Sequence, residues 1–422
     1  MIPRIAQTEM ERLLASSRGR LLVVTGARQV GKSTLVRTST QGWDHVDLDD
    51  PVTRRTWAEL SADRWLARYR RVVVDEIQKL PALFETMKAC HDRDPEFRAV
   101  LLGSSQTLVL RGVRESLAGR AALRELFPLT LSELSAHRLG SSPSRTLEDL
   151  LVQGTPSEFL EALCDPTLAL EPAEAAARES WDRLCLEGGL PAPSFHSDWN
   201  PDDRREWLED YVRTYLQRDL ADIARIEHLE PFVRLLRLAC LRTAQTANWS
   251  DLGREAGVSG PSARNWMAHL EASYHAVLLQ PWFRNPERRL ARAPKIHILD
   301  AGVRRAVLRR AGPLDGAEFE TAVFAEVWKR IRTNRVPVEC FHLRTSDGRE
   351  VDLLLETPHG YIALECKSGT AATATDARHF EGLAEILDKP LLAGIVVSQD
   401  PKARRLREDR PWWAIPAWRL LG

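Results

Sequence analysis

The stretch VVTGARQVGKST, residues 23–34, decides the fold of the first part of the chain. Its Gly26 and Gly31 enclose a loop that follows an apolar run and leads into Lys32 and Ser33, with the spacing G-x-x-x-x-G-K-S. In the order strand, glycine-containing turn and helix, the N–H groups of the turn and the helix N-terminus form a cradle for anions. We therefore expect a phosphate-binding loop and a helix from Lys32.

The residues of this loop have distinct expected roles toward a nucleoside triphosphate. Lys32 is expected to reach the terminal phosphates, and Ser33 is expected to ligate Mg²⁺. The expected nucleotide-binding residues are Gly26, Ala27, Arg28, Gln29, Val30, Gly31, Lys32, Ser33 and Thr34. The expected cofactors are ATP and Mg²⁺.

Two adjacent acids end a second apolar strand, in RVVVDEIQKLP, residues 71–81. Asp75 is expected to support the metal, and Glu76 is expected to polarise the attacking water. Adjacent acids at the carboxyl end of a buried parallel strand are costly without a ligand, so a solvated turn explains them poorly. The pair predicts hydrolysis of the bound triphosphate.

Further catalytic candidates follow this strand. The run AVLLGSSQ, residues 99–106, ends in hydroxyls, of which Ser105 is expected to sense the γ-phosphate, with Ser104 as the alternative. Arg114 and Arg120 flank the segment ESLAG and are offered as transition-state cations, within the chain or on a neighbouring subunit's nucleotide. Arginines on a helix, the local structure expected here, more often form a solvated face.

The composition sets limits on the class of protein. With 422 residues, 44% hydrophobic and 28% charged, the chain is long enough for two to four domains. Lys plus Arg and Asp plus Glu each number 59, so the overall charge does not favour nucleic acid or an anionic membrane. Short apolar runs alternate with helical segments from about residue 20 to 135, which predicts a mostly parallel sheet covered on both faces.

The cysteines and the N-terminal sequence indicate the compartment. The 6 cysteines are scattered singly without a C-x-x-C pair, which argues against a zinc site and a secreted disulfide framework. The first residues lack an apolar signal core, and no long apolar run follows anywhere. We expect a cytoplasmic protein with no membrane contact.

The stretch WSDLGREAGVSGPSARNWMAHLEASY, residues 249–274, has the pattern of a helix-turn-helix. One face of each helix is apolar, and the outward face of the second helix carries Ser262, Arg264, Asn265 and His269. The basic segment 284–295 follows like a wing, with Arg284, Arg288, Arg289 and Arg292. Arg264, Asn265, Arg288 and Arg289 are the expected DNA contacts, more to the backbone than to bases. Winged-helix folds also mediate protein contacts, and that alternative stays open.

The closing part of the chain presents a second group of acids. In the helix expected over 318–331, Glu320 falls in the middle of an apolar face and Glu326 falls to its side. Asp352 begins one strand, and Glu365 and Lys367 share a face of the next strand, in GYIALECKSG, residues 360–369. Glu320, Asp352, Glu365 and Lys367 form a possible second metal site, with Lys367 positioning water. The alternative is a surface ion pair on an ordinary hairpin.

These motifs together resemble a known family. GARQVGKST, DEIQKLP, GSSQ and SLAGRAALRELFPLTLSEL are similar to the AAA+-type prokaryotic ATPases of the group AAA_14 with DUF4143, and the resemblance continues through LEGGLPAP, YVRTYLQRDL and KIHILDAGV. It implies an ATP-binding protein with Gly26, Gly31, Lys32, Ser33, Asp75 and Glu76 at the nucleotide. Residues 138–175 lie outside the resemblance, which leaves the lid geometry open. The order helix acid, Asp, Glu-x-Lys resembles the PD-(D/E)XK restriction-endonuclease-like core, with Val351 in place of its proline.

The sequence thus predicts an α/β protein of four parts. These are an AAA+-like P-loop ATPase domain (1–135), a helical lid or linker (136–235), a winged helix-turn-helix (236–295) and a restriction-endonuclease-like domain (296–422). The expected function is Mg²⁺-dependent ATP hydrolysis coupled to action on DNA, with nuclease activity left open and a homo-oligomer if an arginine acts in trans. The alternative is an ATP-dependent switch that signals through protein contacts without nuclease activity.

Overall fold

The computed structural model describes residues 2–104, 109, 112–113, 115–196, 198–224, 229–285, 287, 289, 292–345 and 348–422, with backbone alone at 195 and 215–224. The chain forms two compact units. The N-terminal unit holds residues 4–128 and 272–274, and the C-terminal unit holds residues 2–3, 129–271 and 275–422. The finer predicted division into four domains stays a prediction.

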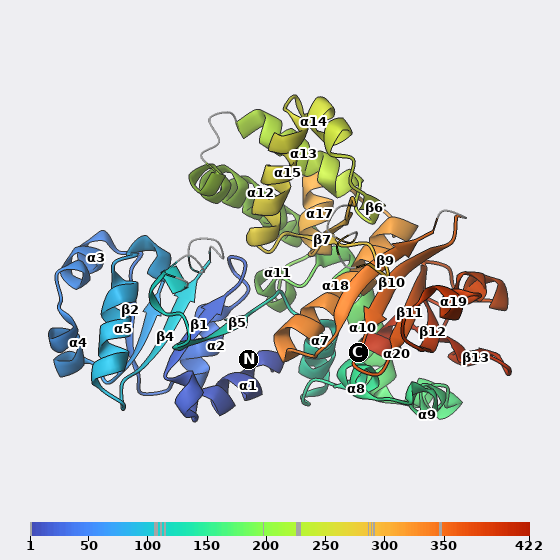
Figure 1. The fold of residues 1–422 in the computed structure, drawn as a ribbon, viewed down its shortest axis with the longest axis horizontal. Helices are drawn as coiled ribbons and strands as arrows, with labels where there is room; N and C mark the ends of the chain where they lie inside the picture. Colours follow the sequence, from blue (N-terminus) through green and yellow to red (C-terminus); the bar gives the residue numbers. More distant parts are fainter. Residues whose placement is uncertain are drawn as a thin grey trace. The chain divides into compact units, whose positions relative to one another are not determined.

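The N-terminal unit is built on a five-stranded sheet in the order β2-β3-β4-β1-β5 (Figure 1). Its strands are β1 Leu21–Thr25, β2 Asp44–Asp47, β3 Arg71–Asp75, β4 Arg98–Gly103 and β5 Ala121–Glu125. Every pair of neighbours runs parallel. The predicted parallel α/β fold is therefore confirmed for this unit.

One element of this sheet differs from the sequence expectation. Arg120 was expected on a helix, but it lies in a turn that leads directly into the edge strand β5 beside β1. All residues of β5 are half-buried, because an edge strand has one neighbour only. Its apolar residues therefore do not form the continuous run that marks the inner strands.

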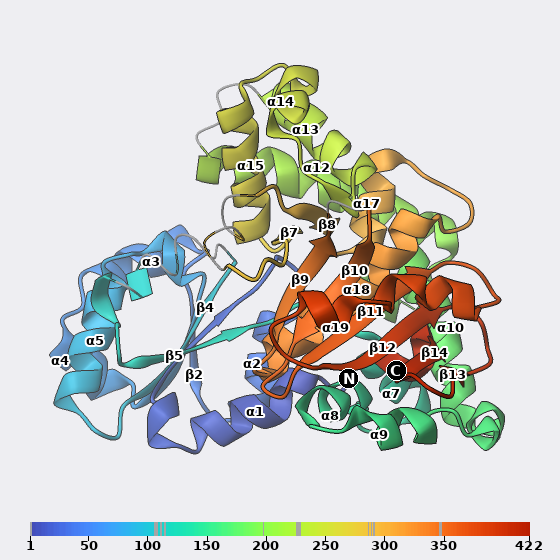
Figure 2. The ribbon, with the colours of Figure 1, turned by 45° about the vertical axis from the view of Figure 1, so that its right-hand side comes forward.

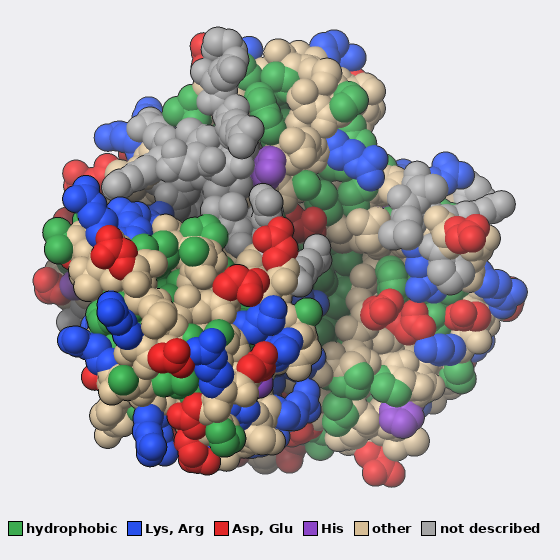
Figure 3. All heavy atoms as spheres, turned by 60° about the vertical axis from the view of Figure 1, so that its left-hand side comes forward, with side chains coloured by type: hydrophobic (Ala, Val, Ile, Leu, Met, Phe, Trp, Pro, Cys, Tyr) green, Lys and Arg blue, Asp and Glu red, His purple; other side chains and the backbone are tan. Residues whose placement is uncertain are grey.

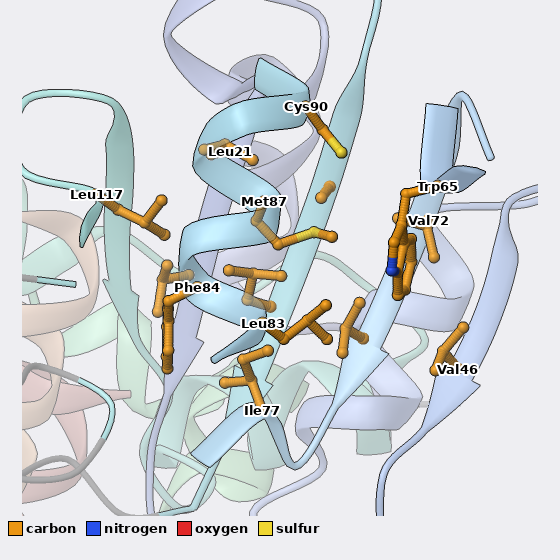
Figure 4. Packing of buried hydrophobic residues seen from close by; sticks show 14 of the residues in the cluster. Leu21, Val46, Trp65, Val72, Ile77, Leu83, Phe84, Met87, Cys90 and Leu117 are labelled. Atoms are coloured by element: carbon orange, nitrogen blue, oxygen red, sulfur yellow. The ribbon is translucent and has the colours of Figure 1, made fainter. Parts of the chain in front are cut away.

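Helices pack on the sheet and close the core of the N-terminal unit. They are α1 Ile5–Leu14, α2 Lys32–Ser39, α3 Pro51–Ala58, α4 Ala62–Arg68 and α5 Leu83–Arg93. Figure 4 shows Leu83, Phe84 and Met87 of α5 turned toward the buried side chains of the strands. Their spacing is that of a helix with one apolar face, which buries that face against the sheet.

The C-terminal unit begins with a helical part. Its helices are α7 Leu131–Leu139, α8 Thr146–Val152, α9 Pro156–Ala162, α10 Pro172–Glu187, α11 Pro191–Phe195, α12 Pro201–Ala224 and α13 Leu229–Leu241, with the short 3-10 helix η3 Pro166–Leu170. The expected helical character of 158–235 agrees with these bounds.

A small three-stranded sheet follows, combined with a helix pair. The helices are α14 Trp249–Ala256 and α15 Gly260–Ala272, and the strands β6 Gln245–Thr246, β7 Ala276–Leu279 and β8 Lys295–Ile298 lie in the order β6-β8-β7. Both pairs are antiparallel, so β8 is the central strand. Leu252 and Ala256 of α14 and Met267 of α15 are fully buried, as the predicted apolar faces require.

The last part is a six-stranded mixed sheet in the order β13-β14-β12-β11-β10-β9 (Figure 2). Its elements are α17 Ala301–Leu308, α18 Gly316–Asn334, β9 Glu339–Arg344, β10 Glu350–Glu356, β11 Tyr361–Lys367, η4 Ala374–Phe380, α19 Leu383–Ile386, β12 Leu391–Ser398, β13 Arg404–Arg407, β14 Trp412–Pro416 and α20 Ala417–Leu421. The strands β10 and β11 form the expected antiparallel hairpin.

Helix α18 is buried on more sides than one apolar face. Phe319, Val323 and Val327 are fully buried, as predicted. Glu326, expected at the side, is 1% exposed and accepts the N–H of Leu131 at 2.7 Å. The reason is that α18 contacts the sheet through β11 and also contacts the helices α8, α10 and α20.

No helix formed by the described residues has both the length and the apolar character that crossing a membrane requires.

Candidate functional site

The predicted phosphate loop lies between β1 and α2, at the carboxyl end of a central strand of the parallel sheet. Gly31 precedes α2 with φ 92°, a left-handed conformation that favours glycine. A Cβ atom on Gly26 would lie 2.1 Å from the carbonyl oxygen of Leu126, so no larger residue fits there. The two glycines of the motif are thus both required by the backbone.

The two expected Mg²⁺ ligands are in direct contact. The Ser33 hydroxyl donates to the Asp75 carboxylate at 2.6 Å, although the residues come from α2 and the end of β3. The buried ammonium of Lys32 donates to the carbonyl oxygens of Gly26 and Ala27 at 2.9 and 2.7 Å. The Lys32 side chain therefore folds back over the phosphate loop.

Glu76 is positioned by its backbone and by two polar side chains. Its φ of 53° is unusual for a residue with a side chain. The Ser104 hydroxyl donates to the Glu76 carboxylate at 3.1 Å, and the Gln78 amide also donates to this carboxylate. Gln78 in turn donates to Ser104 at 3.3 Å, which closes a small network at the ends of β3 and β4.

This network was only partly anticipated. Ser104, the alternative sensor, is 4% exposed and contacts Glu76, whereas the preferred Ser105 lies outside the described residues, as does Arg114. Gln78 was not singled out from the sequence. Its position two residues after Glu76, directly beyond a buried strand, was the available signal.

These residues fit a nucleoside triphosphate with Mg²⁺. The space at Gly26 admits no side chain, the hydroxyl and carboxylate that Mg²⁺ favours already meet, and a lysine lies over the loop. The loop residues Arg28 and Gln29 are half-buried and exposed, respectively, and Val30 is buried. Thr34 is exposed on the first turn of α2.

Arg120 lies at the amino end of the parallel strands, whereas the phosphate loop lies at their carboxyl end. It directly precedes β5, and the register pairs Ala121 with Leu21, the first residue of β1. The phosphate loop follows the last residue of β1, roughly 16 Å away at about 3.3 Å per strand residue. Arg120 also forms a two-pronged ion pair with Asp92, at 2.8 and 2.9 Å. This geometry does not suit a contact with the nucleotide bound by the same chain.

Tyr274 was not expected at this site. Although it directly follows the helix pair in sequence, it belongs to the N-terminal unit. Its hydroxyl is hydrogen-bonded to that of Thr25 at 2.6 Å, and its ring packs edge-on against Phe127 at 5.6 Å. Because Thr25 immediately precedes Gly26, the tyrosine contacts the strand end from which the phosphate loop starts.

The acids of the C-terminal sheet do not form the expected metal site. Among the described residues, no three His, Cys, Asp or Glu side chains form a group that could hold a metal ion. The Asp352 carboxylate accepts the N–H of Cys366 at 2.8 Å. Glu365 accepts the Lys367 ammonium at 2.8 Å and lies 3.6 Å from Nδ1 of His379. Its Oε2 atom is buried without a hydrogen-bond partner.

A cation from another strand lies among these acids. The Lys295 ammonium of β8 lies 2.8 Å from Glu320, 3.3 Å from Glu350 and 3.7 Å from Asp352. From the sequence, Lys295 was counted with the basic wing, but its side chain is 2% exposed. The residue was missed because its partners lie far from it in sequence.

The charge balance shifts the pKa values of this group. Burial opposes the charge of Lys295, but Glu320 and Asp352 outweigh it and raise the pKa of the ammonium. Burial, followed by the Asp352 carboxylate, raises the pKa of Glu320 to about 8. Burial and Asp352 also raise the pKa of Glu365 to about 7. The Lys295 ammonium therefore stays charged, while Glu320 and Glu365 resist ionisation.

Comparison with protein families identifies the parts of the chain. Residues 18–135 match the model of an AAA domain, AAA_14. Residues 315–420 match a domain of unknown function, DUF4143, and residues 178–313 match another, DUF8612. The chain carries an AAA_14 domain and a DUF4143 domain. The resemblance to AAA_14 with DUF4143 is confirmed, and the N-terminal unit is an AAA-type P-loop domain, whereas the restriction-endonuclease-like core stays a prediction.

Relatives are found among curated proteins and solved structures. Uncharacterized proteins of Mycobacterium tuberculosis and Mycobacterium bovis are each 28% identical over 363 residues, 82% of this chain and 70% of theirs. A Walker-type ATPase of Pyrococcus abyssi is 15% identical with a TM-score of 0.45, over 72% of this chain and 95% of that protein. The ORC2 protein of Aeropyrum pernix in its ADP form is 14% identical with a TM-score of 0.30, over 65% and 85%. These scores are too low to assign a fold.

The expected DNA contacts lie in sequence between the AAA_14 and DUF4143 matches. Arg264 and Asn265 belong to α15, and Arg288 and Arg289 belong to the segment between β7 and β8. Arg264 and Asn265 are exposed on α15, and Ser262 and His269 are half-buried beside them. Arg288 lies outside the described residues.

The expectation for Arg289 is corrected. Its guanidinium lies over the Phe341 ring at 4.6 Å, donates to the carbonyl oxygen of Phe283 at 2.8 Å and faces Glu356 at 3.4 Å. The side chain is therefore only 14% exposed. It fixes the segment between β7 and β8 to the DUF4143 sheet, and its donors are directed inward.

Proposed function

We propose that the protein binds and hydrolyses ATP with Mg²⁺ and that its helix-turn-helix part contacts DNA. The hydrogen bond between Ser33 and Asp75, next to a loop that admits only glycine at position 26, carries the ATPase part. A metal bound by this hydroxyl and carboxylate would lie at the phosphate loop. The match of residues 18–135 to an AAA domain supports the same assignment.

The roles of the chain's own residues follow from their contacts. The N–H groups of the loop and the Lys32 ammonium would bind the phosphates, and the lysine would leave the carbonyl oxygens of Gly26 and Ala27 to do so. Ser33 and Asp75 would hold Mg²⁺, which when bound neutralises charge on the phosphate oxygens. Glu76, oriented by Ser104 and Gln78, would take a proton from the attacking water.

The DNA part of the proposal is supported by the arrangement of elements around α14 and α15. Helix α13, strand β6, the helix pair and the hairpin β7–β8 follow one another in the order of a winged helix, with β6 completing the small sheet. In such modules the second helix of the pair enters the major groove. The exposed Arg264 and Asn265 of α15 are able to contact phosphates and base edges.

The test is an ATPase assay with and without duplex, single-stranded and junction DNA. DNA should raise turnover, and binding should weaken steeply with salt because it releases counterions. Arg264→Ala should reduce DNA binding and its salt dependence. Arg205→Ala, which removes an exposed arginine from α12, is the matched control. Unchanged DNA binding in Arg264→Ala would remove α15 from the proposal.

The second candidate is an ATP-dependent switch that acts through protein contacts. The inward position of Arg289 favours it, because this leaves fewer cations for DNA than the sequence indicated. On the face of the molecule drawn in Figure 3, Lys and Arg side chains are interspersed with Asp and Glu. If none of the DNA forms binds or changes ATP turnover, this second function is the better supported.

A further inference from the structure

The carboxylates of the DUF4143 domain are arranged around a cation that the chain itself supplies. Glu320 comes from α18, and Glu350 and Asp352 come from β10. The three approach one atom, Nζ of Lys295, at 2.8, 3.3 and 3.7 Å. A buried ammonium requires such partners, because desolvation without them would cost several kcal/mol.

The backbone of Lys295 leaves it little freedom. It lies in β8, the central strand of the small sheet, where it is paired with Thr246 of β6 on one side and Leu279 of β7 on the other. Its side chain is 2% exposed, whereas that of Glu350 is 37% exposed. The main chain of Lys295 is therefore held on both sides, and its side chain is enclosed by the packing around it.

A divalent cation and this ammonium compete for the same carboxylate oxygens. Mg²⁺ and Ca²⁺ need carboxylate oxygens at about 2.0 to 2.6 Å, at the same oxygens that now face Nζ. A dication within about 4 Å of the ammonium would also be strongly repelled. The Asp352 carboxylate is further committed to the N–H of Cys366 at 2.8 Å.

The remaining acid of the predicted metal site has its own counter-charges. Glu365 accepts the ammonium of Lys367, the residue expected to position water, and faces His379. The lysine is thus engaged by the carboxylate beside it. Among the described residues, no three His, Cys, Asp or Glu side chains come together as a metal-binding group.

We propose that Lys295 is the resident cation of this carboxylate cluster, in the place that a divalent metal would take. The cluster is then a structural junction that fixes β8 to α18 and β10, and the DUF4143 domain works without a metal of its own. This proposal is independent of the ATPase proposal, because every residue that carries it lies outside the AAA_14 domain.

The test compares Mn²⁺ binding by five nucleotide-free full-length proteins, all in an Asp75→Asn background that removes the metal ligand near the phosphate loop: the background alone, Lys295→Ala, Asp352→Asn, the two combined, and Lys389→Ala. The background alone should show no Mn²⁺ binding that depends on Asp352. Lys295→Ala should bind Mn²⁺ at least about tenfold more tightly, since a positive charge has been removed from among three carboxylates. Adding Asp352→Asn to Lys295→Ala should abolish that gain. Electron paramagnetic resonance of free Mn²⁺ provides the readout.

Lys389→Ala is the matched control. Lys389 forms an ion pair at 2.7 Å with Glu356, on the same strand β10, but its side chain is 41% exposed. Its loss should leave Mn²⁺ binding unchanged. A gain as large as that of Lys295→Ala would mean that any lost lysine produces the effect, and would overturn the proposal.

Two further outcomes would also overturn it. One is a folded Lys295→Ala protein that gains no Mn²⁺ binding. The other is Mn²⁺ binding or Mg²⁺-dependent DNA cleavage by protein with Lys295 intact that disappears in Asp352→Asn. This second comparison needs no variant of Lys295, so it decides the question even if Lys295→Ala does not fold. A lost ATPase activity in Lys32→Ala would bear on the proposed function alone.

Discussion

At the scale of single residues, Glu76 combines an unfavourable backbone conformation with a carboxylate that two donors hold on one oxygen. Its φ is 53°, and Ser104 and Gln78 both donate to the same oxygen, Oε2. A left-handed conformation at a residue with a side chain costs about 1 kcal/mol or more, and surrounding contacts have to offset it. The network at the ends of β3 and β4 provides such contacts and fixes the direction of the carboxylate.

Replacing this carboxylate should separate binding from turnover. In Glu76→Gln, ATP turnover should fall at least about 100-fold, because an amide cannot accept the proton of the attacking water. ATP affinity should stay within a factor of about two, since Glu76 is not expected to contact the phosphates. Single-turnover hydrolysis and equilibrium nucleotide binding measure the two effects.

A matched variant guards against a general loss of activity. Glu59→Gln changes an exposed acid at the end of α3 and should leave both quantities unchanged. Turnover by Glu76→Gln at the unaltered rate would mean that another group activates the water, and the role of Glu76 would have to be abandoned.

The residues of the phosphate loop could be predicted from the sequence, whereas the position of Lys295 could not. Gly26, Gly31, Lys32 and Ser33 are fixed by spacing within one short segment, so the sequence contains the whole pattern. The contact of Ser33 with Asp75 follows once Ser33 is placed on the first turn of α2 and Asp75 at the carboxyl end of β3. Lys295 had no such signal, because its partners lie on elements brought together by the fold alone.

At the scale of elements, the inner strands were predictable and the edge strand was not. β3 and β4 are continuous apolar runs because both of their faces are covered. β5 reads AALRE and is half-buried along its whole length, so it has neither a continuous apolar run nor a strict alternation. The same limit applies to α18, where the buried Glu326 and Arg330 bond to α7 and α8, so that charged residues conceal the extent of its burial.

Tyr274, which follows the end of α15, should contribute to the stability of the N-terminal unit. In Tyr274→Phe the buried hydroxyl of Thr25 loses its partner at 2.6 Å. The cost should be about 1 to 2 kcal/mol, because a buried polar group is left without its hydrogen bond. Hydrogen exchange of the β1 amides measures this loss locally, which avoids assuming that the two units unfold together.

Tyr69→Phe is the control for this change. The Tyr69 hydroxyl accepts only from the guanidinium of the adjacent Arg68, at 3.0 Å, within the same N-terminal unit. Its removal should change the protection of β1 much less. Equal losses in the two variants would indicate that the Tyr274 hydrogen bond has no special place at the start of the phosphate loop.

At the scale of the whole molecule, the position of Arg120 bears on assembly. It lies at the start of β5, whereas the phosphate loop and the acids of β3 lie at the carboxyl ends of the same parallel strands. If Arg120 contributes a cation to hydrolysis, it has to reach a nucleotide held by another copy of the chain. Its half-buried position, 35% accessible beside Asp92, leaves it able to exchange that partner for a phosphate.

Mixing two inactive variants tests this requirement directly. Arg120→Ala lacks the cation but keeps the nucleotide site, and Glu76→Gln lacks the base but keeps the arginine. If the arginine acts in trans, turnover returns at interfaces where the Arg120→Ala subunit supplies the nucleotide site and the Glu76→Gln subunit supplies the arginine. In an equal mixture of freely exchanging dimers, the rate should reach up to about a quarter of the wild-type rate. The measurement is the ATP turnover of the mixture, compared with that of each variant alone.

The matched control is Arg93, which forms an ion pair with Asp63. Arg93→Ala alone should hydrolyse ATP normally, and it is also measured in a mixture with Glu76→Gln. Normal turnover by Arg120→Ala alone would show that the arginine takes no part in hydrolysis, and its ion pair with Asp92 would then be its whole role.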